Sequence, residues 1–376
     1  MGMIAAKGEL MSKKNNRGEA RGRDIHDGKE RTLDKWHPGQ LSLFQTFLPS
    51  SEKYSNTIEL YDAIPKFSTK RLMSKKRIGP EGQEVFLPTL EREFKYKDTT
   101  YILKMKPART TNKKKEEIEY YPSEREELVE EALRKIACDP LNGAYIGLLA
   151  GVQFTMYELR EELRKRGHSI SLDDLKRSLL ICRSVGLSIT ERGGDETIMD
   201  SSIFPLVVIS SRKNWRADPK GSRCFVQFNP LVTASIEALT FRQFDYETLM
   251  SYKMQLSRWL HKRLYHNYIN AGMLNTYHFR LSSVKRDSGL LNNERISQDV
   301  KYLERSLEQL VEKNVIWGFD KEVRHGGRNN RIADVLYTLQ ASMDFIKEMK
   351  AANAHHADIQ KKLPAVLSRN QKWLSF

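Results

Sequence analysis

The order of structural signals between residues 152 and 228 constrains the fold of this chain more than any other feature. A short apolar segment predicts a strand, and the capping box of Thr155 with Glu158 then predicts a helix. A second helix begins after Ser171, ends at Gly186 and leads into three further β segments. Strand, helix, tight turn, helix and β wing are the order of a winged-helix domain.

The same order of elements recurs after residue 240, which indicates that the chain contains two copies of one structural unit. The expected elements are a long helix, a short strand, two helices and two wing strands, over 254–269, 276–280, 282–288, 293–313, 315–319 and 335–339. A hairpin of alternating residues at 90–105 and a helix beginning after Ser123 precede the first copy. We therefore expect an α+β protein with two tandem winged-helix domains, over 84–239 and 240–345.

The two ends of the chain depart from this pattern. Residues 1–80 carry scattered charges and few periodic apolar positions, which predicts a mostly disordered basic leader. Residues 346–376 form a C-terminal tail, into which a short helix at 341–354 is expected to run.

The charge of the chain indicates a polyanionic partner. Its 63 Lys and Arg against 48 Asp and Glu give a formal net charge of +15 at pH 7, which suits nucleic acid or an anionic membrane. A membrane is disfavoured because no apolar run approaches the roughly 20 residues that span a bilayer, and residues 1–35 lack a signal peptide. We expect a soluble, cytoplasmic protein.

The sequence carries no recognisable catalytic motif. It has neither a Gly-x-x-x-x-Gly-Lys-[Ser/Thr] phosphate loop nor acidic residues at spacings typical of two-metal nucleases. Cys138, Cys182 and Cys224 are far apart and each lies in apolar sequence, which favours buried reduced thiols over a disulfide or a zinc site. The sequence predicts a binding protein, with no enzymatic activity and no cofactor.

The long helix of the second copy has the best candidate face for reading DNA. Its apolar stripe is Ile296, Val300, Leu303, Leu307 and Leu310. The opposite side then presents Gln298, Lys301, Tyr302 and Arg305, whose side chains suit base edges and phosphates in a major groove. The wing connection at 321–331 adds Arg324, Arg328 and Arg331, which suit phosphate or a minor groove. Glu304 and Glu308 favour the alternative, an ordinary solvated helix face.

The equivalent helix of the first copy offers Lys176, Arg177 and Arg183, but Asp173 and Asp174 in its first turn repel phosphate. We expect this domain to contact DNA less strongly and to act partly in dimerisation. Its loop is more basic, and the candidate DNA-binding residues there are Arg212, Lys213, Arg216, Lys220 and Arg223.

A short apolar peptide stands alone in the polar leader, with the sequence Gln40, Leu41, Ser42, Leu43 and Phe44. It resembles the peptide by which replication proteins dock on the bacterial DNA sliding clamp. In that resemblance Gln40 enters a polar pocket, and Leu43 and Phe44 fill an apolar one. The alternative is a short amphipathic stub that packs on its own domain.

Several motifs together resemble the plasmid replication initiators with two tandem winged-helix domains, most closely the TrfA type. They are Gln-Leu-Ser-Leu-Phe at 40–44, Phe-Thr-Met-Tyr-Glu-Leu at 154–159, Gly-Ser-Arg-Cys at 221–224, the long helix after Tyr252 and the segment 303–317. The resemblance implies a protein that binds repeated origin sequences, called iterons, helps to open adjacent DNA, and recruits host initiator proteins, helicase and sliding clamp. It also implies a homodimer in equilibrium with a monomer.

Two alternatives remain at this point. A winged-helix transcriptional regulator would have no replication role, and its pentapeptide would be accidental. At the other end of the chain, the segment 371–376 also has a Gln followed by Leu and Phe. It is either a second, weaker clamp contact or an apolar end that packs on the second domain.

Overall fold

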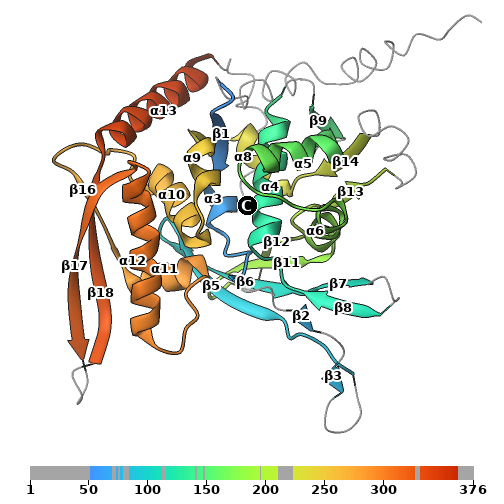
Figure 1. The fold of residues 1–376 in the computed structure, drawn as a ribbon, viewed down its shortest axis with the longest axis horizontal. Helices are drawn as coiled ribbons and strands as arrows, with labels where there is room; N and C mark the ends of the chain where they lie inside the picture. Colours follow the sequence, from blue (N-terminus) through green and yellow to red (C-terminus); the bar gives the residue numbers. More distant parts are fainter. Residues whose placement is uncertain are drawn as a thin grey trace, which may run out of the picture. The chain divides into compact units, whose positions relative to one another are not determined.

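The computed structural model describes ten stretches of the chain, which Figure 1 draws in colour. They are 51–69, 73–74, 77–78, 84–111, 116–139, 142–146, 149–194, 196–210, 223–326 and 331–362. The expected C-terminal segment 371–376 lies outside them.

The first unit contains the strand, the two helices and the hairpin that the sequence predicts. Its elements are α4 (Glu124–Ala137), β9 (Gly143–Ile146), β10 (Leu149–Thr155), α5 (Met156–Lys165), α6 (Leu172–Ser184), β13 (Leu206–Val208) and β14 (Arg223–Gln227). The Glu158 N–H donates to the Thr155 hydroxyl (3.0 Å), and the Thr155 N–H donates to the Glu158 carboxylate (2.6 Å), so the expected capping box starts α5. β14 pairs with β10 and β13, which gives the strand order β13-β14-β10-β9.

A second sheet lies against this unit and has the order β12-β11-β6-β5. Its strands are β5 (Leu90–Tyr96), β6 (Thr99–Lys106), β11 (Gly186–Glu191) and β12 (Thr197–Ser201). The hairpin predicted at 90–105 is therefore confirmed, and the strand after α6 extends it. Smaller strands adjoin it: β2 (Met73–Ser74), β7 (Ala108–Thr111) and β8 (Glu117–Tyr120) form one sheet, and β3 (Arg77–Ile78) and β4 (Glu84–Val85) another.

The second unit repeats the strand arrangement of the first. It follows α8 (Pro230–Glu237), which contacts β10 of the first unit, and its elements are β15 (Phe241–Asp245), α9 (Tyr246–Ser251), α10 (Gln255–Asn267), β16 (Thr276–Arg280), α11 (Leu281–Ser288), α12 (Ile296–Glu312), β17 (Ile316–Gly326) and β18 (Arg331–Ala341). The order β16-β18-β17 matches β10-β14-β13, because in each unit the strand before the two helices pairs with the last strand of the hairpin. α11 ends at Gly289, whose φ of +63° is the left-handed cap expected there.

The leader was expected to reach residue 80, and this boundary is wrong. β1 (Tyr54–Ile58) pairs with β15, and α3 (Glu59–Ala63) follows it directly. Ile58, Tyr61 and Ile64 are buried in the core. The segment looks polar in sequence because it carries buried charges, and part of their pairing comes from Arg134 and Lys262 in helices far along the chain.

The C-terminal helix is longer than the predicted 341–354. It is α13 (Met343–Lys362), which packs against β15. Phe345, Ile346 and Met349 are buried, and the ring of Phe345 lies 5.3 Å from that of Tyr265. The first part of the expected tail therefore belongs to the second unit.

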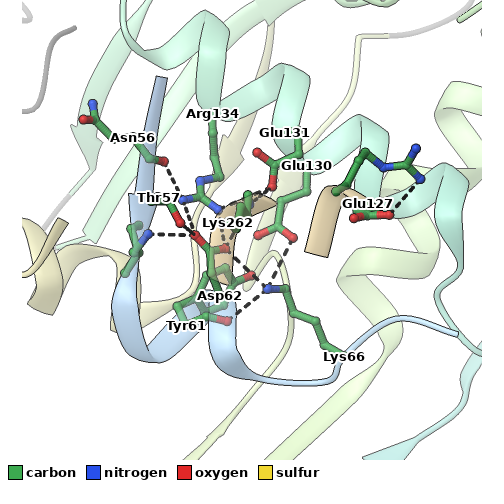
Figure 2. Close-up of polar contacts among 12 residues, drawn as sticks. Asn56, Thr57, Tyr61, Asp62, Lys66, Glu127, Glu130, Glu131, Arg134 and Lys262 are labelled. Carbon is green, nitrogen blue, oxygen red and sulfur yellow. Dashed lines mark hydrogen bonds and ion pairs between the residues drawn. The ribbon is translucent and has the colours of Figure 1, made fainter. Parts of the chain in front are cut away.

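Asp62 is the centre of a buried ionic network that joins α3, α4 and α10 (Figure 2). Its carboxylate accepts from Arg134 (2.7 and 3.0 Å), Lys262 (3.2 Å), the Thr57 hydroxyl (2.7 Å) and the Ile58 N–H (2.7 Å). Burial alone would raise the pKa of this carboxyl, but the charges of Arg134 and Lys262 hold the pKa well below its usual range. Asp62 is therefore ionised and fully coordinated in the core.

The same network ties the second unit to the first. Lys262 of α10 also donates to Glu131 of α4. One turn earlier, the buried guanidinium of Arg258 donates to Glu124 (2.8 Å) and Glu127 (3.1 Å) of α4. Because the side chains of Arg258 and Lys262 are only 1% and 13% exposed and both meet carboxylates of α4, the two units are held together by contacts that are costly to break.

A buried histidine, His261, and a half-buried one, His266, lie on α10. The Tyr252 hydroxyl and His261 Nδ1 are 2.9 Å apart, and the His261 ring stacks on Tyr265. His266 Nε2 lies 2.8 Å from the Thr57 hydroxyl. Burial lowers the pKa of both His261 and His266 to about 4, since the imidazolium loses its hydration.

These histidines predict a loss of stability in mild acid. Unfolded histidine takes up a proton near pH 6.5, whereas the folded groups resist protonation down to about pH 4. Their contribution is therefore complete above about pH 6.5 and decreases as the pH falls, by up to about 1.4 kcal/mol per pH unit for each group. Urea unfolding between about pH 7 and pH 5 measures this, and His261→Gln should reduce the dependence. An equal free energy of unfolding at both pH values would contradict it.

Candidate nucleic-acid interface

Helix α12 buries the apolar stripe that its spacing predicts, namely Val300, Leu303, Leu307 and Leu310, while Ile296 is half-buried. Gln298, Lys301 and Arg305 are exposed together on the other side. These three positions follow the i, i+3, i+7 spacing of a single helix face. The structure thus brings three of the four candidate residues of this helix into one polar, basic row.

Tyr302, the fourth candidate, departs from that row. It is half-buried, and burial together with the charge of Glu124 raises its pKa, so its hydroxyl is close to α4. Arg258 and Glu127 are further electrostatic neighbours of the same group. Tyr302 therefore lies beside the junction between the two units.

The sequence alone predicts that Glu304 presents a free carboxylate on the solvated face of the helix. In the structure, two side chains of the hairpin lie at this carboxylate. Lys321 of β17 donates to it at 2.6 Å, and the Tyr337 hydroxyl of β18 lies at 3.4 Å. This ion pair offsets the negative charge of Glu304 and connects α12 to the hairpin. Lys321 is the residue that sequence reasoning overlooked. Its spacing of two residues from Phe319, which puts both side chains on one face of the strand, was the available signal.

The hairpin β17–β18 is longer than the predicted wing strands, and Figure 1 shows it alongside α12. The expected loop at 321–331 is mostly strand, because β17 runs to Gly326 and β18 begins at Arg331. Arg324 and Arg331 are exposed on these strands, and Arg324 pairs in register with Asp334. Arg328 lies outside the described residues.

In the first unit, α6 presents its cations differently. Arg177 donates to Asp174 (3.1 Å), which also accepts from Arg125 (2.8 Å), so the charge of Arg177 is already engaged. Lys176 and Arg183 are exposed. The carboxylate of Asp174 serves the cap of the helix, because the Ser171 hydroxyl donates to it and accepts from its N–H.

Of the five candidate residues of the basic loop in the first unit, Arg223 alone lies within the described residues. Arg223 begins β14 and lies 3.8 Å from Glu158 and 3.3 Å from the Asn142 side chain. Arg212, Lys213, Arg216 and Lys220 lie outside the described residues, as do Gln40, Leu41, Ser42, Leu43 and Phe44.

The described residues contain no group of His, Cys, Asp and Glu that could hold a metal ion. Cys138, Cys182 and Cys224 are buried, as the apolar sequence around each predicts. Among the helices that the structure describes, none is long and apolar enough to cross a membrane.

No protein-family model matches the chain, and no curated protein matches it. Solved structures with a detectable likeness include domains 2 and 3 of RctB, with 12% identity, a TM-score of 0.42, and coverage of 78% of this chain and 99% of that chain. Another is the Pi initiator protein in complex with iteron DNA, with 12% identity, a TM-score of 0.38, and coverage of 58% and 92%. Likeness at this level assigns neither a family nor a function to the chain.

Proposed function

We propose that the second unit is a winged-helix domain that binds double-stranded DNA, with α12 in the major groove and the hairpin β17–β18 against the backbone. The observation that carries this proposal is the exposed row of Gln298, Lys301 and Arg305 on α12. The hairpin lies beside this helix, and its Lys321 forms an ion pair with Glu304. Gln and Arg side chains can each make two hydrogen bonds to one base, whereas Lys meets phosphate or guanine as a point charge. In this proposal Arg324 and Arg331, which are exposed on the hairpin, neutralise phosphates next to the helix.

The first unit is proposed to be a second winged-helix domain with a different balance of roles. Three of its four strands, β10-β14-β13, are ordered as in the second unit, but Arg177 is engaged by Asp174. Backbone contacts through Lys176, Arg183 and the basic loop, together with self-association, suit it better than base reading. This assigns sequence recognition mainly to the second unit.

The biological role that fits best is initiation of plasmid replication at origin repeats. It rests on the resemblance of the sequence to tandem winged-helix initiators and on the pentapeptide at 40–44. In this role the chain binds iterons, promotes opening of the origin, and recruits host initiator proteins, helicase and sliding clamp in the bacterial cytoplasm. A monomer–dimer equilibrium would regulate the number of active molecules.

The DNA-binding part of the proposal predicts a steep dependence on salt. If about six to eight phosphates are neutralised, the logarithm of the association constant should fall with the logarithm of salt concentration with a slope of roughly −5 to −7. Titration of duplex DNA at several salt concentrations measures the slope. Binding that is insensitive to salt would rule out this mode.

The clamp-docking part is tested separately. The Leu43→Ala/Phe44→Ala double variant is expected to bind origin DNA as the natural chain does but to fail in plasmid replication, because the apolar side chains that fill the clamp pocket are lost. A peptide spanning residues 36–48 should bind purified clamp directly. If the variant also lost DNA binding, the peptide would instead belong to the folded domain.

A further inference from the structure

A cavity of about 670 Å³ lies away from the α12 row, among α3, β5, α10 and α11. α3 contacts both β5 and α10, and β5 contacts α11 (Figure 1). The volume falls within the roughly 300–1,000 Å³ typical of small-molecule sites. The backbone N–H of Lys95 on β5 donates to Asp287 of α11 (3.0 Å), which holds two of the walls together.

The charge of the cavity favours an anion. Five cations against three carboxylates leave a formal charge of +2, and the cations are Lys95, Lys97, Lys262, Arg263 and Arg286. Four of these have a carboxylate partner within the wall: Lys97 pairs with Glu59, Lys262 with Asp62, and Arg263 and Arg286 with Asp287. The ammonium group of Lys95 has no such partner among the described residues.

Two further donors line the wall. The Ser283 hydroxyl and the Trp259 indole N–H make no hydrogen bond with any described residue, and both side chains line the cavity. A lysine and a hydroxyl that lack partners are the groups that commonly hold a phosphate oxygen.

The aromatic side chains of the wall are paired with cations. The guanidinium of Arg263 lies 5.1 Å from the Trp259 ring centre, and the ammonium of Lys97 lies 5.1 Å from that of Tyr96. The Tyr96 ring is held in place because its hydroxyl donates to Glu59 (2.6 Å). Flat rings backed by cations are the surfaces on which nucleobases stack.

We propose that this cavity binds a nucleotide, with a phosphate on Lys95 and Ser283 and the base against Trp259. The ligand is either a free nucleoside phosphate or one nucleotide of a single DNA strand, since both carry the same chemistry. This site is distinct from the face of α12 and does not depend on it.

The test uses the full chain and two fluorescent probes, an adenosine triphosphate analogue and a single-stranded oligothymidylate, followed by anisotropy. At least one is expected to bind, and Lys95→Ala should weaken it roughly tenfold, the loss typical of one charged hydrogen bond. Lys104→Ala is the matched control, because Lys104 lies on the neighbouring strand β6 and outside the cavity. Trp259→Leu should weaken binding, whereas Trp317→Leu, at an exposed position outside the cavity, should not.

The pattern of probes identifies the source of the ligand. Tighter binding of the triphosphate indicates a free nucleotide, and tighter binding of the oligonucleotide indicates a DNA strand; either supports the site. Duplex DNA affinity, measured in parallel, should be the same in Lys95→Ala and the natural chain. The proposal is overturned if neither probe binds at roughly millimolar concentration, or if Lys95→Ala and Lys104→Ala bind equally well.

Discussion

Replacement of Asp62 by alanine is expected to lower the free energy of unfolding by about 3–5 kcal/mol. The carboxylate is buried and receives hydrogen bonds from Arg134 and Lys262, with Thr57 and the Ile58 N–H completing its coordination. Its removal leaves the guanidinium of Arg134, which is 1% exposed, without its shortest ion pair. The cost arises from an uncompensated buried charge more than from the lost attraction.

Urea unfolding of Asp62→Ala and of Asp344→Ala gives the comparison. Asp344 forms an ion pair with Lys347 at 3.9 Å, but both side chains are largely exposed, so its loss should cost about 0–1 kcal/mol. Equal effects of the two substitutions would mean that the network around Asp62 does not stabilise the junction of α3, α4 and α10. If Asp62→Ala is too unstable to purify, Arg134→Met tests the same ion pair from the other side. It should also have a lower free energy of unfolding than the natural chain.

The double substitution Lys301→Ala/Arg305→Ala is expected to weaken specific DNA binding roughly a hundredfold, with Arg305→Ala alone costing about 1–3 kcal/mol. Both side chains are exposed on the face of α12 proposed to enter the major groove. A base contact by Arg305 also predicts reduced discrimination at one base pair. Titration of the natural site and of single-base variants measures both effects.

Glu308→Ala is the matched control on the same helix, because Glu308 is exposed but negatively charged and should not contribute attraction to DNA. Its affinity should equal or exceed that of the natural chain. Equal loss by Arg305→Ala on every DNA sequence would reassign Arg305 to a phosphate contact. No loss in the double variant would exclude α12 as the interface.

Local signals in the sequence predicted much of the secondary structure. The capping box of Thr155 with Glu158, the αL glycine at 289 and the alternation over 90–105 each describe contacts within a few residues, and each is present in the structure. By contrast, the segment 54–66 was assigned to the leader. Its burial depends on Arg134 and Lys262, which lie far along the chain and leave no local pattern.

For the candidate site too, the sequence predicted what depends on local periodicity and did not predict what depends on contacts between distant elements. Helical periodicity was enough to put Gln298, Lys301 and Arg305 on one face, because the apolar stripe determines which side is buried. The neutralisation of Glu304 was not predictable, since it depends on the register of β17 against α12. The hydrogen bond from Arg177 to Asp174 was also not predicted, because it depends on the positions of the two side chains.

Footprinting of the full chain on the DNA that flanks its own gene tests the central claim most directly. The predicted result is protection of a series of direct repeats beside an AT-rich tract, lost in Lys301→Ala/Arg305→Ala and retained in Glu308→Ala. Absence of protected repeats, or protection that the double variant retains in full, would contradict recognition of origin repeats through α12.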